Sequence, residues 1–215
     1  MAVLAIWAGL GMKQLPEPWQ NLPGDEVYWL VPEPPQAEES FDAWCARLAA
    51  KIPPHTEFLG GFSLGGMIAC EQAKAMPRLK GLVLLSFAHS RKYWRNYLNG
   101  LARSGILGLF LRLPARLVFQ YGLPLMRVFG RKTFVTMNRA LRHWNPEQTK
   151  TVLRWLLAFG SASISKPFLL LLGGKDPWLK SGAEAVLLPH AGHFLFPKHR
   201  HVVGQHVHSW MQLHA

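Results

Sequence analysis

A serine flanked by glycines stands at a point in the chain where a nucleophile could be held exposed. Ser63 lies within Gly61-Phe62-Ser63-Leu64-Gly65, between an apolar run at residues 56–62 and a small-residue stretch at residues 64–73. The apolar run predicts a strand and the following stretch predicts a helix, which together form the setting of a nucleophile elbow. The competing interpretation is a glycine-rich turn without a chemical role, because short motifs of this kind often occur by chance.

Two later segments supply the partners that a serine nucleophile needs. Residues 170–177 form an apolar run that leads through two glycines to Asp176, and residues 187–194 form another that leads to His193. Serine, aspartate and histidine in this order, each after its own strand, is one of the chain orders in which catalytic triads occur. The sequence therefore predicts that Ser63, Asp176 and His193 meet at the carboxyl ends of three strands.

Elimination also favours Asp176 as the acidic member. The only other aspartates, Asp25 and Asp42, both precede the serine. Between Ser63 and His193 the remaining carboxylates do not close a strand-like run; they are Glu71, Glu147 and Glu184.

With these residues identified, the chain resembles the α/β-hydrolase superfamily of serine hydrolases over most of its length outside a central segment. Gly-His-Phe at residues 192–194 is typical of the histidine loop of that family. The resemblance implies that Ser63 is the nucleophile, that His193 is the general base and then the general acid, and that Asp176 orients the imidazole. The alternative base is His190. It could instead be a loop histidine without a chemical role, hydrogen-bonded to solvent or backbone. The resemblance favours His193, because the base of the family directly follows the glycine.

An acyl-transfer site also needs donors for the negative oxygen of its tetrahedral intermediate, normally two backbone N–H groups. Leu64, the residue after the nucleophile, is expected to supply one of them. Residues 3–11 have the form of an early strand and its loop, which predicts Leu10 as the second donor. Many relatives begin this loop with His-Gly where this chain has Ala8-Gly9, a change that leaves backbone donation intact.

The composition and patterning predict one α/β domain with an insertion. The 215 residues, 49% of them hydrophobic, are enough for one good-sized core, and no repeat or long linker divides them. Short apolar runs alternate with helix-like segments, which indicates an α/β-hydrolase fold with a minimal, mostly parallel sheet of about six strands flanked by helices. The expected strands are residues 2–7, 26–31, 57–62, 81–86, 167–172 and 183–188, and the expected helices include residues 40–51 and 202–213.

We expect residues 1–88 and 166–215 to form the α/β-hydrolase core and residues 89–165 to form a basic helical lid inserted in it. This lid segment contains thirteen lysines and arginines but a single acidic residue, Glu147, so its formal charge equals the +12 of the whole chain. Glycines and prolines predict breaks between its helices. The expected breaks are at Gly100, Gly108, Pro114, residues 122–124, Gly130 and residues 145–146.

Three interpretations of the lid are open. Arginines spaced among apolar residues, as at residues 106–119, are typical of a helix at the interface of an anionic membrane. A basic lid could also receive an acidic acyl carrier, such as a carrier protein or the phosphates of coenzyme A. Alternatively, the arginines solvate the outer face while the apolar face covers an acyl pocket. No uncharged run in the lid reaches the ~18 to 20 residues that a bilayer span needs.

The N-terminal run and the cysteines bear on the cellular compartment. Residues 1–12 are uncharged and apolar, like the core of a signal peptide, but they lack a basic start, and we favour a buried strand. Cys45 and Cys70 both fall in predicted helices, where core packing explains them without a disulfide. The sequence predicts a cytoplasmic protein, peripherally associated with a membrane if the lid contacts lipid.

Other function classes have less support. The basic charge suggests a nucleic-acid partner, but no zinc spacing, recognition helix or aromatic-basic sheet motif is present, so none is expected. The C-terminal histidines form His-x-His pairs that face different sides of a helix, which does not suit metal ligation, and we expect no metal. The family resemblance implies an enzyme without cofactors.

These observations predict a serine hydrolase that cleaves an ester or thioester of an apolar acyl group through an acyl-enzyme intermediate. The chain resembles the small carboxylesterases and acyl thioesterases of this superfamily, including those that act on carrier-bound acyl esters. Dehalogenases and epoxide hydrolases of the superfamily are disfavoured, because they use a carboxylate nucleophile where this chain has Ser63. The alternative is a catalytically inactive protein of this fold that binds a membrane surface or an acidic partner through residues 89–165.

Overall fold

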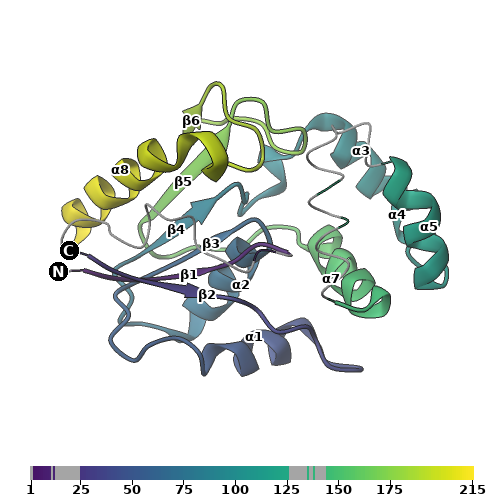
Figure 1. Cartoon of the computed structure of the whole chain (residues 1–215), viewed down its shortest axis with the longest axis horizontal. Helices are drawn as coiled ribbons and strands as arrows, with labels where there is room; N and C mark the ends of the chain where they lie inside the picture. Colours follow the sequence, from purple (N-terminus) through teal and green to yellow (C-terminus); the bar gives the residue numbers. More distant parts are fainter. Residues whose placement is uncertain (1, 11, 13–24, 126–134, 136–137, 139–143) are drawn as a thin grey trace.

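A computed structural model of the chain describes residues 2–10, 12, 25–125, 135, 138 and 144–215. Within these residues, six strands form one sheet in the order β2-β1-β3-β4-β5-β6, and all neighbouring strands are parallel. The strands are β1 (Val3–Trp7), β2 (Glu26–Leu30), β3 (Phe58–Phe62), β4 (Gly81–Leu85), β5 (Phe168–Gly173) and β6 (Ala185–Leu188). Figure 1 shows α8 (Phe196–His214) on one face of the sheet, and α1 (Phe41–Ala49) and α2 (Leu64–Gln72) on the other.

Each face of the sheet carries its own apolar cluster, because successive side chains of a strand point to opposite faces. Leu59 and Leu84 belong to the cluster that packs under α1 and α2. Their neighbours Phe58 and Val83 belong to the cluster that packs under α8. A sheet covered on both faces needs apolar residues at every position of its central strands, which is why these strands read as continuous apolar runs.

The six expected strands are confirmed, with bounds that differ from the expected ones by at most two residues. The helix expected at residues 40–51 is α1, and the Ser40 hydroxyl caps it by accepting a hydrogen bond of 3.2 Å from the N–H of Ala43. The helix expected from residue 202 begins earlier, at Phe196, with a proline in its first turn. The first turns of this helix contain histidines and charged residues. They interrupt the helical spacing of apolar residues from which its start was predicted.

The N-terminal run forms an interior strand, as favoured from the sequence. All five residues of β1 are buried, and β1 lies between β2 and β3. Cys45 and Cys70 are buried free thiols in α1 and α2, which agrees with core packing. No helix of the described ranges has the length and apolar character required to cross a bilayer.

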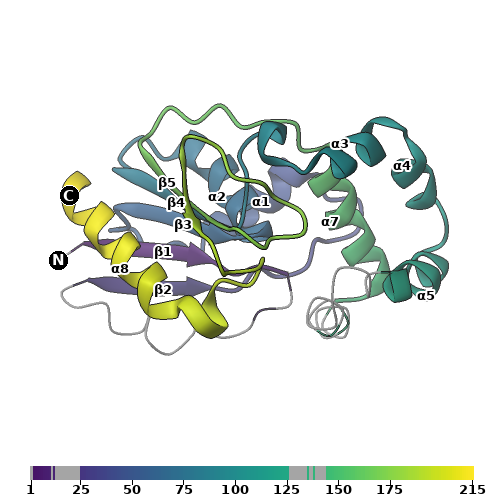
Figure 2. The same ribbon diagram turned by 90° about the horizontal axis from the view of Figure 1, so that it is seen from above.

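A series of helices connects β4 to β5. Those among the described residues are η3 (Arg91–Tyr93), α3 (Asn96–Arg103), α4 (Ile106–Phe110), α5 (Ala115–Leu125) and α7 (Pro146–Ala158). Figure 2 shows α3, α4, α5 and α7 together at the end of the molecule toward which the strands point. The carboxyl ends of the strands therefore face this helical segment.

Several predicted helix breaks are wrong. Helices begin directly after Pro114 and at Pro146 as expected, but α3 runs through Gly100, α4 through Gly108 and α5 through residues 122–124. A Cβ on Gly100 or Gly108 would meet nothing within 4 Å, so both lie on open helix surface. A glycine there costs about 1 kcal/mol relative to alanine, which is too little to end a helix. Gly130 and five of the basic residues of the lid lie outside the described residues.

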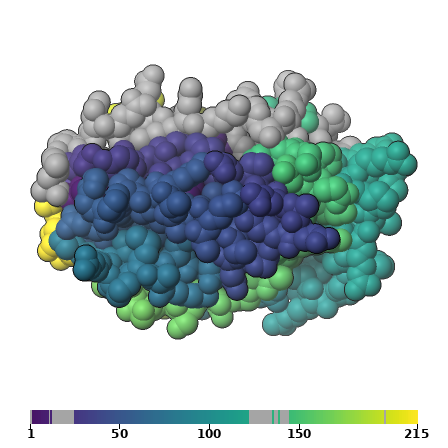
Figure 3. All heavy atoms as spheres, turned by 90° about the horizontal axis from the view of Figure 1, so that it is seen from below, coloured from purple at the N-terminus to yellow at the C-terminus, as the bar shows by residue number. Residues whose placement is uncertain are grey.

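The helix α7 packs against the α/β body through aromatic side chains. The ring of Trp155 lies 5.4 Å from the ring of Trp44 and 5.6 Å from that of Phe41, both on α1. Asn145 and Gln148 form a capping box that fixes the start of α7. In the space-filling view of Figure 3, the green atoms of α7 lie beside the dark blue atoms of α1, and the teal atoms of α4 and α5 form the far end.

Candidate active site

The order of the strands reverses between β1 and β3 at the carboxyl edge of the sheet. From β1 the chain moves to β2 on one side, and from β3 onward it moves to the other side. In open parallel sheets, ligands bind outside the carboxyl ends of the strands where the strand order reverses in this way. Ser63 directly follows β3, and Leu10 lies in the loop after β1, so both border this point.

Ser63 has the backbone conformation of a sharp, strained turn. Its φ of 51° and ψ of −116° lie in a region that residues other than glycine rarely adopt. Close packing on both sides holds the turn: a Cβ on Gly61 would lie 2.0 Å from the carbonyl carbon of Gly65, and one on Gly65 would lie 2.1 Å from the carbonyl oxygen of Trp7. Glycine is therefore required at both positions, and the strand-turn-helix expected around Ser63 is present.

Ser63, His193 and Asp176 form a continuous hydrogen-bonded chain. The distance from Ser63 Oγ to His193 Nε2 is 3.0 Å, and that from His193 Nδ1 to Asp176 Oδ2 is 2.8 Å. Because a carboxylate only accepts, the network assigns the imidazole proton to Nδ1 and leaves Nε2 to accept from the serine hydroxyl. Asp176 and His193 are buried, whereas Ser63 is partly exposed. This arrangement can remove a proton from a serine as it attacks.

The second oxygen of the Asp176 carboxylate is also bonded. Asp176 Oδ1 accepts hydrogen bonds from the backbone N–H groups of Trp178 at 2.8 Å and Leu179 at 3.2 Å. Asp176 is completely buried, so these donors and His193 replace the water that a carboxylate would otherwise bind. With both oxygens bonded, the carboxylate has one fixed orientation.

Aromatic rings surround the imidazole of His193. The ring centre of Trp178 lies 4.4 Å from that of His193, and those of Phe194 and Phe62 lie at 5.5 Å and 5.6 Å. Apolar walls of this kind exclude water and strengthen the electrostatic interactions inside a site.

The two expected oxyanion donors follow neighbouring strands, Leu10 in the loop after β1 and Leu64 at the start of the helix after β3. Leu64 is the first residue of α2, so its N–H has no acceptor within the helix and points out of the helix start. Leu10 is partly buried and packs against the core. Its neighbour Gly9 lies against Phe62, since a Cβ on Gly9 would come within 2.6 Å of that ring. The donor roles themselves stay predictions.

The structure separates the two candidate bases. His193 contacts both Ser63 and Asp176, whereas His190 is an exposed residue of the turn after β6. The interval between Asp176 and His193 is spanned by turns and β6, and it still brings the two side chains into contact.

Three residues near the site were not found from the sequence. The buried Ser86 hydroxyl donates to the carbonyl oxygen of His193 at 2.6 Å. Trp178 packs on the imidazole, and Arg95 Nε donates to the carbonyl oxygen of Asp176 at 2.8 Å. Of the three, only Ser86 could have been found from the sequence. It is a polar residue directly after an apolar strand, a position that places it at the carboxyl edge of the sheet.

The sequence pattern of the Alpha/beta hydrolase family matches residues 7–206. The chain belongs to this family. Among curated proteins, no sequence matches. The fold agrees with this membership. The described residues form one parallel sheet of six strands with helices on both faces, as expected from the sequence.

Solved structures share this fold. A candidate lipase (lip1) from Acinetobacter baumannii AYE superposes with a TM-score of 0.63 and 15% identity, over 98% of this chain and 84% of the other. The RedJ thioesterase of the prodiginine biosynthetic pathway in Streptomyces coelicolor gives a TM-score of 0.62 and 15% identity, over 97% and 85%. A candidate aryl esterase from Burkholderia cenocepacia gives a TM-score of 0.62 and 15% identity, over 99% and 90%. At such low identity these likenesses concern the fold.

Proposed function

We propose that this protein is a serine hydrolase that cleaves an ester or thioester of an apolar acyl group, with Ser63, His193 and Asp176 as its catalytic triad. The observation that carries the proposal is the hydrogen-bonded chain from Ser63 through His193 to the buried Asp176. Membership of the Alpha/beta hydrolase family supports the reaction class. The thioesterase and esterase names among proteins of the same fold are consistent with it.

In the acylation step, Ser63 Oγ attacks the acyl carbonyl carbon and its proton passes to His193 Nε2, 3.0 Å away. Asp176 stabilises the resulting imidazolium through the hydrogen bond to Nδ1. The backbone N–H groups of Leu64 and Leu10 donate to the oxyanion of the tetrahedral intermediate. The carbonyl then re-forms, the bond to the alcohol or thiol breaks, and His193 returns the proton to the leaving group.

Water completes the reaction. His193 Nε2 accepts a proton from a water molecule as its oxygen attacks the carbonyl carbon of the acyl-Ser63 ester. The second tetrahedral intermediate collapses with cleavage of the bond to Ser63 Oγ, which recovers the proton from His193. The products are a carboxylic acid and the free enzyme, and no cofactor or metal takes part in the proposed steps.

The apolar nature of the acyl group is inferred from the walls of the site. Phe62, Phe194 and Trp178 lie around His193, with ring centres 4.4 to 5.6 Å from that of the imidazole. Aromatic side chains favour an apolar acyl group, because the contact removes apolar surface of both from water.

We further propose that the lid segment contacts an anionic membrane surface. Ile106 and Leu109 of α4 are 63% and 66% exposed, and Arg103, Arg112 and Arg116 around them are exposed as well. Residues 96–125 contain no aspartate or glutamate. Protruding apolar side chains beside arginines suit lipid, whereas an acidic carrier protein would require mainly charge.

Part of the basic charge of the lid segment has a structural use. Four of its cationic side chains donate to backbone carbonyl oxygens inside the protein; they are Arg91, Arg95, Lys150 and Arg154. The membrane proposal therefore relies on Arg103, Arg112 and Arg116 alone among the described arginines and lysines of helices α3 to α5 and their connections.

The catalytic proposal is tested by labelling with a fluorophosphonate probe and by hydrolysis of p-nitrophenyl esters and acyl thioesters of rising chain length. We expect labelling and turnover in the unsubstituted protein, none in Ser63→Ala, and full activity in the control Ser209→Ala, which changes an exposed serine of α8. An unlabelled, well-folded protein that hydrolyses none of these substrates would favour the alternative of an inactive binding protein.

The membrane proposal is tested by co-sedimentation with vesicles of anionic and of zwitterionic phospholipid. We expect binding to anionic vesicles that weakens in Arg112→Glu/Arg116→Glu and in Ile106→Ser/Leu109→Ser. Equal binding of all variants, or retention on an acidic acyl carrier protein but not on vesicles, would contradict the membrane contact.

A further inference from the structure

The start of the lid segment runs alongside the loop that carries Asp176. Trp94 and Leu179 form an antiparallel bridge, the N–H of Lys180 donates to the carbonyl oxygen of Tyr93 at 2.7 Å, and the N–H of Arg95 donates to the carbonyl oxygen of Trp178 at 3.0 Å. Two segments far apart in the sequence are thus paired through their backbones. A displacement of one of them must disturb the other.

The side chain of Arg95 extends this pairing to Asp176 itself. Arg95 Nε donates a hydrogen bond of 2.8 Å to the backbone carbonyl oxygen of Asp176. The carboxylate of Asp176 is in turn held by the N–H groups of Trp178 and Leu179. Arg95 therefore bonds to two carbonyl oxygens of this short turn, those of Asp176 and Trp178. The N–H groups of the same turn orient the carboxylate.

The same turn carries an aromatic wall of the histidine. The ring of Trp178 meets the imidazole of His193 at 4.4 Å and an interplanar angle of 75°, a T-shaped contact that restricts rotation of the imidazole. Tyr97 adds another bond to this turn, since its hydroxyl donates to the carbonyl oxygen of Pro177. Both partners of the Asp176–His193 hydrogen bond thus depend on the position of one turn.

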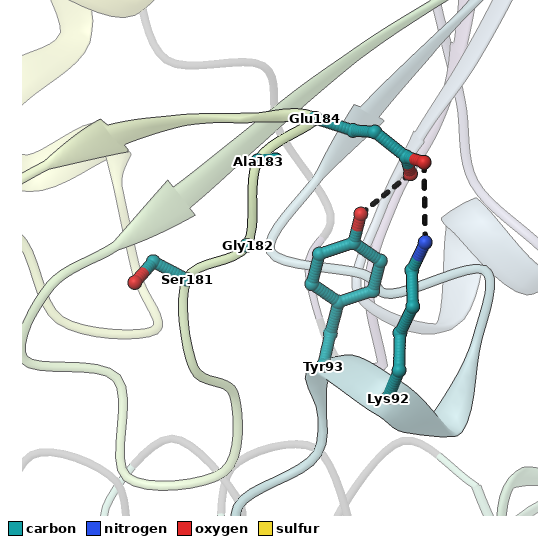
Figure 4. A pocket seen from close by; sticks show the side chains of 6 residues that line it. All are labelled: Lys92, Tyr93, Ser181, Gly182, Ala183 and Glu184. Atoms are coloured by element: carbon teal, nitrogen blue, oxygen red, sulfur yellow. Dashed lines mark hydrogen bonds and ion pairs between the residues drawn. The ribbon is translucent and has the colours of Figure 1, made fainter.

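A second contact between η3 and the segment before β6 lies beyond this turn. It borders a cavity of about 210 Å³ that is separate from the triad. Figure 4 shows Glu184 at its rim accepting from the Tyr93 hydroxyl at 2.5 Å and the Lys92 ammonium at 3.1 Å. Hydrogen bonds from Tyr93 and then Lys92 keep the pKa of Glu184 below its ordinary value, so the carboxylate is charged at neutral pH. These contacts attach η3 to the segment before β6.

From this geometry we propose that Arg95 is a positioning residue of the active site: it holds the turn at residues 176–179 so that Asp176 and Trp178 fix the imidazole of His193 in the orientation that receives the Ser63 proton. The inference rests on the proposed hydrolase function. It links the lid segment to the chemistry, because Arg95 is also the residue that precedes α3. Movement of α3 would reach the triad through this side chain.

Arg91 provides a matched control in the same segment. Its guanidinium also donates to backbone carbonyl oxygens, those of Leu157 at 2.6 Å and Phe159 at 3.2 Å at the end of α7. Arg91 therefore attaches η3 to the end of α7 with two bonds of the same kind, and neither of these bonds involves the turn that carries Asp176. A purely structural role of Arg95 would make the two arginines equivalent in a kinetic experiment.

The test compares Arg95→Ala, Arg95→Lys and Arg91→Ala with the unsubstituted protein in hydrolysis of a p-nitrophenyl ester, with folding monitored by circular dichroism. We expect Arg95→Ala to lower kcat roughly tenfold or more with KM changed less than about twofold, because a small misplacement of catalytic groups slows the chemical step. Arg95→Lys, which keeps a donor, should recover part of kcat. Arg91→Ala should keep kcat within about twofold even if its stability falls.

The gentler variant Tyr97→Phe covers the case in which Arg95→Ala does not fold, since it removes one hydroxyl and keeps the ring. It should lower kcat by a smaller factor of about two to five without a change in KM. Equal kcat values for Arg95→Ala and Arg91→Ala, or for Tyr97→Phe and the unsubstituted protein if Arg95→Ala is unfolded, would overturn the positioning role alone. Absence of Ser63-dependent turnover in the unsubstituted protein would instead overturn the hydrolase function and this inference with it.

Discussion

The hydroxyl of Ser86 donates a hydrogen bond of 2.6 Å to the backbone carbonyl oxygen of His193, and both residues are buried. Ser86 directly follows β4, has a positive φ of 46°, and donates its own N–H to the carbonyl oxygen of Leu171 on β5. The histidine loop is thus attached to the centre of the sheet at the residue that the proposed mechanism uses.

Replacement of Ser86 by alanine should weaken both the fold and the site. The carbonyl of His193 would lose its buried donor, which costs about 1–3 kcal/mol of unfolding free energy. A looser histidine loop should also lower kcat. Urea unfolding and ester hydrolysis measure the two effects. The control Ser104→Ala, at an exposed hydroxyl that donates to the carbonyl of Leu101, should cost less than about 0.5 kcal/mol; equal losses in the two variants would refute the special role of Ser86.

The two histidines of the final loop should differ sharply in kinetics. His193→Ala removes the group that contacts both Ser63 and Asp176, so kcat should fall by about three or more orders of magnitude. His190→Ala changes an exposed side chain and should leave kcat within about twofold. Steady-state hydrolysis of a p-nitrophenyl ester compares them directly. A large loss in His190→Ala with an active His193→Ala would reverse the assignment of the base.

Glycine substitutions should have opposite effects at the elbow and on the lid segment. A Cβ on Gly65 would lie 2.1 Å from the carbonyl oxygen of Trp7, a backbone atom that cannot move away, so Gly65→Ala should destabilise the protein by more than about 2 kcal/mol. A Cβ on Gly108 in α4 would meet nothing within 4 Å, and Gly108→Ala should be neutral or stabilise by up to about 1 kcal/mol. The midpoints of urea denaturation measure both effects. A Gly65→Ala variant as stable as the unsubstituted protein would contradict the close packing of α2 on β1.

His89 should make the stability depend on pH. Burial lowers the pKa of His89, while Glu184 raises it and Lys92 lowers it by smaller amounts. The unfolded chain therefore binds the proton first as the pH falls below about 6.5, and stability present at pH 7 is lost between that value and the lower pKa of the folded state. His89→Gln, which does not titrate, should lose less unfolding free energy between pH 7 and pH 5. Parallel slopes for the two proteins would show that His89 has the same pKa folded and unfolded.

The sequence by itself determined the strands, the elbow and the identity of the main candidate residues. Continuous apolar runs predict strands buried on both faces, and the glycines beside Ser63 predict a tight turn, because each feature depends on neighbours along the chain. The end of such a run also marks where polar residues can reach the carboxyl edge of the sheet. Asp176 and His193 were therefore identified, and the structure brings them together at 2.8 Å.

Only the tertiary structure decided how these residues are held. Arg95 contacts Asp176 across 81 positions of sequence and Ser86 contacts His193 across 107, and no local pattern encodes either pair. The helix α3 also continues through Gly100, because the low helix propensity of a single glycine does not determine where a helix ends. Local patterns fix which segments are buried, but the direction in which loops return over the sheet edge fixes the partners of each candidate catalytic side chain.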